Sequence, residues 1–74
     1  MSKAIRILSM YDRLYEGKML VKSEEAVRFR VEPRTIQRDI DDIRAFLADE
    51  GSEETEVIYD RRKLGYVMKK RKIV

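Results

Sequence analysis

Four polar residues follow the only proline of the chain. They are Arg34, Thr35, Gln37 and Arg38. On a helix, the first and the last of them lie opposite the apolar stripe, together with Asp41 and Ala45, and the other two flank that face. Arginine can make two parallel hydrogen bonds to guanine, glutamine can do the same with adenine, and threonine can meet a base acceptor or a thymine methyl group. Because these side chains read base edges in the major groove, the segment predicts contact with double-stranded DNA. The alternative is an ordinary solvated helix face.

A second group of basic residues lies between two β-prone runs near the end of the chain. It consists of Arg61, Arg62 and Lys63. Three neighbouring positive charges on a short loop are well suited to neutralising phosphates. Together with Lys22, these residues are predicted to contact the DNA backbone or the adjacent minor groove. The alternative is a loop that serves only solubility.

The net charge of +3 conceals an uneven distribution along the sequence. The formal charge is +4 over residues 1–38, −7 over 39–56 and +6 over 57–74. The two basic blocks contain the two groups of predicted contacts, which favours a polyanionic partner. The acidic block between them is expected to lie on a surface that faces away from DNA.

The sequence contains neither cysteine nor histidine. Their absence excludes disulfides, thiolate and imidazole metal sites, and the usual pairs of nucleophile and base. We therefore expect no enzyme activity, no metal and no cofactor. The longest uninterrupted apolar run is Ala45–Ala48, which is too short for a membrane span or a signal peptide. We expect a cytoplasmic protein with no membrane partner.

The elements that position these residues begin with two predicted helices. Apolar residues at spacings of three and four predict a first helix over about 4–15, and Gly17 is its expected left-handed stop. The apolar run 19–21 fits an extended connector or a very short strand. Ser23 is expected to cap a short second helix over about 24–30.

A third helix is predicted over about 33–49, with Pro33 at its first position. Only about three residues separate it from the second helix, which is the connection length of a helix-turn-helix. Asp39 projects towards the apolar edge of this helix, and we expect it to pair with Arg6 or Arg13. The apolar residues of the first and third helices are expected to form the core: Ile36, Ile40, Ile43, Leu47, Phe46, Leu8 and Tyr11.

A β-hairpin is predicted after an acidic loop over 49–56. Its strands are the runs 57–59 and 66–68, joined by about six residues with the basic group at the tip. Tyr59 and Tyr66 are expected to pack the hairpin onto the helices. The order of helix, helix, helix and hairpin predicts a small α+β domain.

Two stretches of this sequence resemble the N-terminal winged helix-turn-helix of bacterial DeoR-like regulators, in particular those with a C-terminal WYL domain. The first is Val31–Arg44, VEPRTIQRDIDDIR, which is similar to the recognition-helix pattern V-S-x-R-T-I-x-R-D-I of that family. The second is Tyr59–Tyr66, YDRRKLGY, which ends in the Gly-Tyr step typical of the wing. The resemblance covers about residues 3–69. It departs from the pattern at Arg30, where a turn glycine is common, at Glu32, where serine is usual, and at Glu25, where an apolar residue is frequent.

The resemblance implies a winged helix-turn-helix over residues 1–69 that binds double-stranded DNA as part of a bacterial transcriptional regulator. Arg34, Thr35, Gln37 and Arg38 would face the major groove, and Arg61, Arg62 and Lys63 would form the wing contacts. It also implies that residues 70–74 are a basic tail or linker to an effector domain that is missing from this chain. That domain senses a ligand in the family and helps to dimerise it, so a homodimer is a further expected partner.

Two other functions remain open. The first is a winged-helix module for protein interaction or dimerisation, which would use the acidic block or the apolar rim and read no DNA sequence. The second is RNA binding. It is disfavoured because the sequence lacks interleaved surface aromatics that stack on single-stranded bases.

Overall fold

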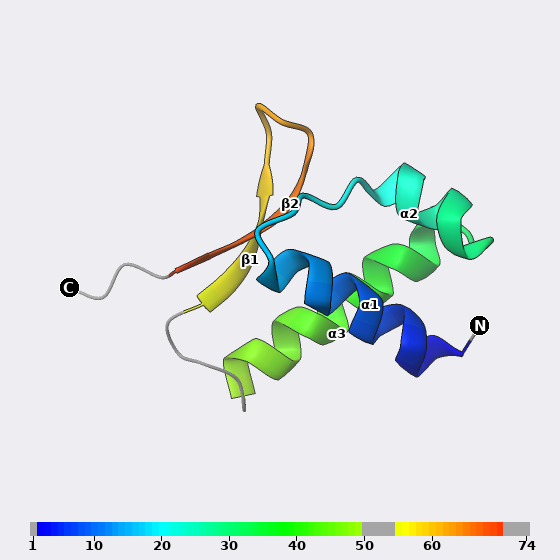
Figure 1. Cartoon of the computed structure of the whole chain (residues 1–74), viewed down its shortest axis with the longest axis horizontal. Coiled ribbons are helices and arrows are strands. Elements are labelled where there is room, and N and C mark those ends of the chain that lie inside the picture. The colour runs from blue at the N-terminus through cyan, green and yellow to red at the C-terminus, as the bar shows by residue number, and fades with distance from the viewer. Residues whose placement is uncertain (1, 50–54, 71–74) are drawn as a thin grey trace.

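The computed structural model describes residues 2–49 and 55–70, which form three helices followed by a two-stranded antiparallel hairpin. The helices and strands, in chain order, are α1 (Lys3–Tyr15), α2 (Lys22–Phe29), α3 (Pro33–Asp49), β1 (Thr55–Asp60) and β2 (Gly65–Lys70). In Figure 1, α1 crosses α3, α2 lies beside the beginning of α3, and the hairpin rises beside the end of α1. This arrangement confirms the predicted α+β class: a three-helix winged-helix architecture in which the hairpin is the wing.

Local hydrogen bonds explain where α1 and α2 begin. The Ser2 side chain accepts a hydrogen bond of 3.2 Å from the Ile5 amide and so caps α1. The predicted cap of α2 by Ser23 is wrong, because α2 begins at Lys22, with Val21 at its N-cap position and no side-chain cap. The preceding Leu20 is held to Tyr66 by a pair of backbone hydrogen bonds of 2.8 and 2.7 Å. This pairing confirms the predicted extended connector, and the helix starts directly after it.

A residue in the left-handed backbone conformation follows the end of α1 and of α2. Gly17 has a φ of 89°, as its expected role as a stop requires. Arg30 has a φ of 56° and ends α2 one residue earlier than predicted. The Val31 amide then donates a hydrogen bond of 3.0 Å back to the Ala26 carbonyl, a bond typical of a left-handed helix end. At Arg30 the backbone thus adopts the left-handed conformation in which glycine is favoured. Glycine is common at this position in the DeoR-like pattern that the sequence resembles.

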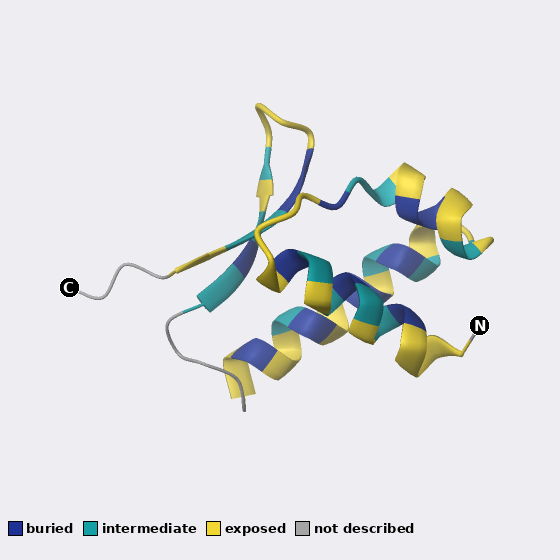
Figure 2. Cartoon of the chain, viewed as in Figure 1, coloured by how far each residue is buried: buried dark blue, intermediate teal, exposed yellow. Residues whose placement is uncertain are grey.

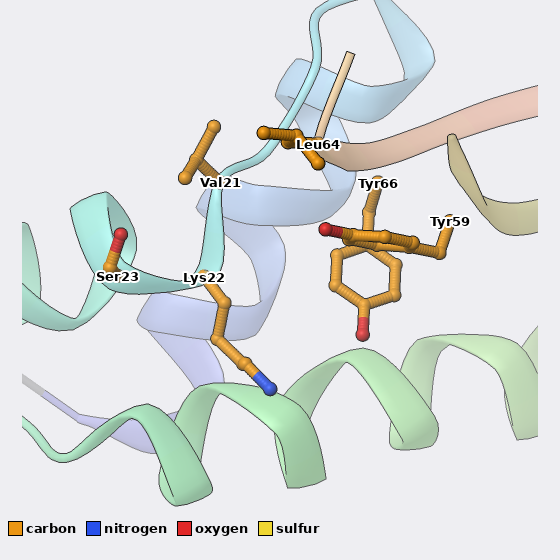
Figure 3. Close-up of a pocket in the computed structure, with 6 residues that line it drawn as sticks. All are labelled: Val21, Lys22, Ser23, Tyr59, Leu64 and Tyr66. Carbon is orange, nitrogen blue, oxygen red and sulfur yellow. The ribbon is translucent and has the colours of Figure 1, made fainter. Parts of the chain in front are cut away.

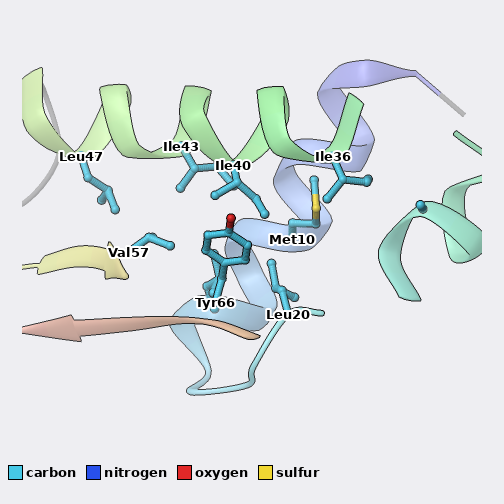
Figure 4. Close-up of a cluster of buried hydrophobic side chains, with 10 residues drawn as sticks. Met10, Leu20, Ile36, Ile40, Ile43, Leu47, Val57 and Tyr66 are labelled. Carbon is cyan, nitrogen blue, oxygen red and sulfur yellow. The ribbon is translucent and has the colours of Figure 1, made fainter. Parts of the chain in front are cut away.

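Helix α3 has the predicted bounds and supplies the largest part of the core. Ile36, Ile40, Ile43 and Leu47 recur at spacings of four, three and four, and all are buried as expected. Figure 4 shows these side chains pointing at a layer formed by α1, the connector and the hairpin. The residues of that layer that the figure labels are Met10, Leu20, Val57 and Tyr66. Figure 2 shows the same pattern as buried stretches that alternate with exposed ones along α1 and α3.

Two residues predicted to lie in the core do not. Leu8 is 64% exposed and Phe46 is 48% exposed, while Tyr11 is partly buried. The crossing of α1 over α3 buries the side of α1 that carries Met10 and Leu14. Leu8 lies on a different side of α1, so the apolar spacing alone assigned it to the core wrongly.

Two ion pairs with buried carboxylates join the helices. Arg6 donates two hydrogen bonds to the Asp39 carboxylate, one of them from Nη2 to Oδ1 at 3.2 Å, and both residues are buried. This contact confirms that Asp39 is structural, and it raises the pKa of Arg6 above its ordinary value. Arg13 likewise donates two hydrogen bonds, of 2.8 and 2.6 Å, to buried Glu25. Arg13 of α1 therefore neutralises the charge of Glu25, at a position where the DeoR-like pattern frequently has an apolar residue.

The hairpin is longer than the sequence predicts. Its register runs from Thr55 opposite Lys70 to Asp60 opposite Gly65, and four residues, 61–64, connect the strands instead of about six. A side chain at Gly65 would collide with Met19, and its Cβ would lie 2.9 Å from the Leu20 carbonyl oxygen. Glycine therefore allows the wing to approach the connector closely.

Parts of two predicted segments lie outside the described residues: 50–54 of the acidic loop and 71–74 of the tail. Lys70, expected to begin the tail, is the last residue of β2. Over the two described ranges, no helix combines the length and apolar character that crossing a membrane would require.

Candidate nucleic-acid interface

The N-terminal half of α3 carries Arg34 and Arg38 on its solvent side. The two residues are one turn apart and both are exposed. They lie opposite the buried stripe that contains Ile36 and Ile40. Two guanidinium groups therefore project outward from the first turns of α3, as the helical projection predicts.

Thr35 and Gln37 lie on opposite edges of this outward face, about 160° apart around the helix. Both side chains are partly buried. The structure thus brings Arg34 and Arg38 together and separates the other two predicted base contacts from each other.

Gln37 is the centre of a hydrogen-bond network that joins three elements. Its Oε1 accepts hydrogen bonds from Lys22 Nζ at 3.2 Å and from the Tyr66 hydroxyl at 2.9 Å. Its Nε2 donates a hydrogen bond of 3.1 Å to Asp41, which in turn accepts one from Arg44 at 3.4 Å. The network ties the start of α2, the middle of α3 and the second strand of the wing to one another.

A shallow pocket of about 490 Å³ lies between the beginning of α2 and the wing. It is lined by Val21, Lys22, Ser23, Tyr59, Leu64 and Tyr66, shown in Figure 3. In that view the Lys22 side chain reaches towards α3, and the rings of Tyr59 and Tyr66 lie close together. These two rings make an edge-to-face contact with centroids 5.1 Å apart. Lys22 thus connects α2 to α3 through its bond to Gln37 and also lines the pocket beside the wing.

The tip of the wing is a turn organised by Asp60. The Asp60 carboxylate accepts hydrogen bonds from the Arg62 amide at 2.9 Å and from the Lys63 amide at 3.1 Å. These bonds hold the pKa of Asp60 below its ordinary value of 3.8, and the bond from the Lys63 amide lowers it most. The side chains of Arg61, Arg62 and Lys63 are all exposed. Because the carboxylate fixes the backbone of the turn, the wing presents these three cations from a defined loop.

The ion pairs divide the cations of the molecule into two groups. Within the described residues, the paired cations are those of α1, the segment after it, the end of α2 and the second half of α3: Lys3, Arg6, Arg13, Lys18, Arg28 and Arg44. Over the same residues, no ion pair is made by the cations predicted to contact DNA: Lys22, Arg34, Arg38, Arg61, Arg62 and Lys63. Arg30, Lys69 and Lys70, which were not predicted contacts, also make none there.

Three acidic residues of α3 form ion pairs within the domain. Asp39 pairs with Arg6, Asp42 with Lys3 at 3.3 Å, and Asp41 with Arg44 at 3.4 Å. The acidic block therefore does not form a single surface in its described part. Asp39 is buried, and Asp41 is exposed on the outward face of α3, about 40° around the helix from the mean direction of Arg34 and Arg38. The expectation that the whole block faces away from the predicted contacts is wrong for Asp41, whose carboxylate is bonded to Gln37 and Arg44.

Three features of this region were not predicted. Arg30 is an exposed cation in the turn before α3, and Leu64 is an exposed apolar residue with a φ of 60° at the wing tip. The third is the hydroxyl contact of Tyr66 with Gln37, across 29 positions of the sequence. The position before Gly65 indicated a turn near Leu64, but no local pattern indicates the contact of Tyr66.

Comparison of the chain with protein-family models, with curated proteins and with solved structures gives no match.

Proposed function

We propose that this chain binds double-stranded DNA in a sequence-dependent manner, with α3 in the major groove and the wing on the backbone or the adjacent minor groove. The observation that carries the proposal is the division of the cations by ion pairing. Arg34, Arg38 and the three cations of the wing tip are exposed and make no ion pair within the described residues. Unpaired cations at defined positions of a rigid scaffold are what a polyanion needs, because each can neutralise a phosphate or bond to a base.

The proposed roles follow from how each side chain is held. Arg34 and Arg38 are free to make the two-bond contact with guanine, and Thr35 can meet a base at the edge of the same face. Gln37 would have to exchange an internal partner to make the two-bond contact with adenine, because its Oε1 already accepts two hydrogen bonds. We therefore assign the dominant readout to the two arginines and treat Gln37 as the residue that couples α3 to the wing.

The biological role that we propose is that of the DNA-binding domain of a bacterial transcriptional regulator in the cytoplasm. The support is the resemblance of Val31–Arg44 and Tyr59–Tyr66 to the DeoR-like family, together with the three helices and hairpin of the fold. The ligand-sensing domain that accompanies such domains in the family would then be a separate part of the regulator.

The direct test is selection of bound duplexes from a random pool, followed by fluorescence anisotropy with the selected sequence and a scrambled control. If about six phosphates are neutralised, the slope of log K against log salt should be roughly −5. A preference for the selected duplex over the scrambled one would support base readout. Absence of duplex binding at low salt would overturn the proposal, and equal affinity for all duplexes would reduce it to non-specific binding.

A second candidate function is association with a protein partner. The observation that favours it is the exposure of Leu8 and Phe46 on neighbouring helices, outside the proposed DNA-binding surface. Size-exclusion chromatography with and without duplex separates the two functions: a DNA-binding chain elutes with the duplex, whereas a module that only associates with protein elutes at the same position whether or not duplex is present.

A further inference from the structure

An exposed apolar surface lies where α1 crosses α3. We call it the α1–α3 face and define it by Ile5, Leu8, Tyr11, Tyr15 and Phe46. Leu8, Tyr15 and Phe46 are 64%, 72% and 48% exposed, and Ile5 is exposed too. The Tyr11 ring, partly buried, contacts Phe46 edge to face at 6.1 Å and stacks on Tyr15 at 6.2 Å. A pocket of about 230 Å³, bordered by Leu8, Tyr11 and Phe46, hollows the centre of this face.

The area of this face is sufficient for a small dimer. Large apolar and aromatic side chains each carry on the order of 200 Å² of surface, so the exposed parts of these residues sum to about 500 Å². Patches of this size on small proteins mark contact sites. Two copies joined through the whole face would remove about 1,000 Å² from water, which is the area a biological interface needs and lies in the range of weak, reversible contacts.

The charges around the face suit a second copy of the same chain. Asp42, the acidic residue that borders the pocket, is already paired with Lys3 at 3.3 Å. The centre therefore requires no opposite charge from a partner, and two identical apolar centres can meet without bringing like charges together. Asp12 is exposed and projects between Ile5 and Leu8 around α1, so the contact must be centred on Leu8, Tyr11 and Phe46 and leave Asp12 in water.

The direction in which the face points also suits a symmetric pair. Phe46 lies about 100° around α3 from the mean direction of Arg34 and Arg38. If the direction of the two arginines is taken as forwards, the α1–α3 face points to the side, roughly at a right angle to it. A two-fold axis along the forward direction leaves both pairs of arginines on the same side of the dimer.

We propose that the α1–α3 face is the contact between two copies of this chain related by a two-fold axis. Each copy inserts its Leu8 and Phe46 side chains against those of the other. The contact itself is independent of DNA. Its consequence, two α3 helices presented to two half-sites of a palindrome, rests on the proposed function.

The test is sedimentation equilibrium of the purified chain without DNA, from about 1 µM to about 1 mM, the range in which a contact of this size dissociates. The variants Leu8→Glu and Phe46→Glu place a charge in the face, and each should weaken association at least about tenfold. Both positions are solvent-exposed, so circular dichroism should show unchanged helix content. Val27→Glu is the matched control: Val27 is 79% exposed but lies on α2, outside the face, so this variant should associate as the wild type does.

A wild-type chain that remains monomeric up to about 1 mM would overturn the proposal. Equal loss of association in Val27→Glu and in Leu8→Glu would also overturn it, because the contact would not be local. The outcome is separate from that of the proposed function. A dimer that ignores DNA contradicts only DNA binding, and a monomer that binds a single half-site contradicts only the dimer.

Discussion

The Tyr66 hydroxyl donates a hydrogen bond of 2.9 Å to the side-chain oxygen of Gln37, and this bond connects the wing to α3. The ring of Tyr66 is buried and also lies 5.3 Å from the guanidinium carbon of Arg44. One aromatic residue thus fixes the hairpin relative to the helix that we propose to read DNA.

Tyr66→Phe removes the hydroxyl but keeps the packing of the ring. We expect the free energy of unfolding to fall by about 1 kcal/mol, because one hydrogen bond is lost and Lys22 still satisfies the Gln37 oxygen. Chemical denaturation measures this change, and the side-chain amide signals of Gln37 should shift in NMR spectra. Tyr59→Phe is the control, since Tyr59 is exposed and should change stability by less than about 0.5 kcal/mol. Equal effects of the two variants would contradict a specific role for the Tyr66 hydroxyl.

Arg38→Ala should reduce the preference for the selected duplex over a scrambled one, because it removes a proposed base contact. The double variant Arg61→Ala, Arg62→Ala should weaken both duplexes alike and flatten the salt slope by about two, because it removes phosphate contacts. Anisotropy titrations at several salt concentrations separate the two effects. Lys18→Ala is the control, because Lys18 pairs with Glu16 outside the proposed interface. Identical behaviour of the Arg38 and wing variants would disprove the division of roles.

Asp39→Ala leaves the buried Arg6 guanidinium without its partner. We expect a loss of about 3–5 kcal/mol in unfolding free energy, the usual cost of an uncompensated buried charge. Asp42→Ala breaks the exposed pair with Lys3 and should cost less than about 1 kcal/mol. Urea denaturation of both variants provides the comparison. A small loss in Asp39→Ala would mean that Arg6 reaches water when its partner is removed.

Arg30→Gly should stabilise the domain by up to about 1 kcal/mol. Glycine adopts the left-handed conformation of residue 30 without the steric cost that a side chain bears, although it also adds freedom to the unfolded chain. Arg28→Gly is the matched control within α2, where glycine should destabilise by about 1 kcal/mol. Thermal melts show whether each variant has a higher or a lower melting temperature than the wild type. A lower melting temperature for Arg30→Gly would show that the arginine side chain contributes more than the strain costs.

The turn at the wing tip should depend on acid pH through Asp60. The pKa of Asp60 is lowered in the folded chain, first by the Lys63 amide and also by the Arg62 amide. The stabilisation of the turn is therefore fully present above the unfolded-state pKa and is lost as pH falls through the lower, folded-state pKa. The amide NMR signals of Arg62 and Lys63 should shift with a midpoint below 3.8. A midpoint at or above that value would contradict the bonded turn, and Asp60→Asn should abolish the transition.

Features that depend on local spacing could be predicted from the residues alone. Pro33 and the recurrence of Ile36, Ile40, Ile43 and Leu47 fixed the bounds and the buried side of α3, and with them the outward direction of Arg34 and Arg38. The left-handed stop at Gly17 was equally predictable, because glycine favours this conformation.

Long-range contacts decided the rest, and only the tertiary structure contains them. Backbone pairing between β1 and β2 extended the hairpin beyond its β-prone centre, and the anchoring of Leu20 to Tyr66 set the start of α2. The hydroxyl of Tyr66 turned Gln37 from a predicted base contact into a bridge to the wing. The crossing of α1 over α3 left Leu8 and Phe46 in solvent. Periodicity gives the direction of a side chain around its own helix, but whether that side is covered depends on where the neighbouring helix lies.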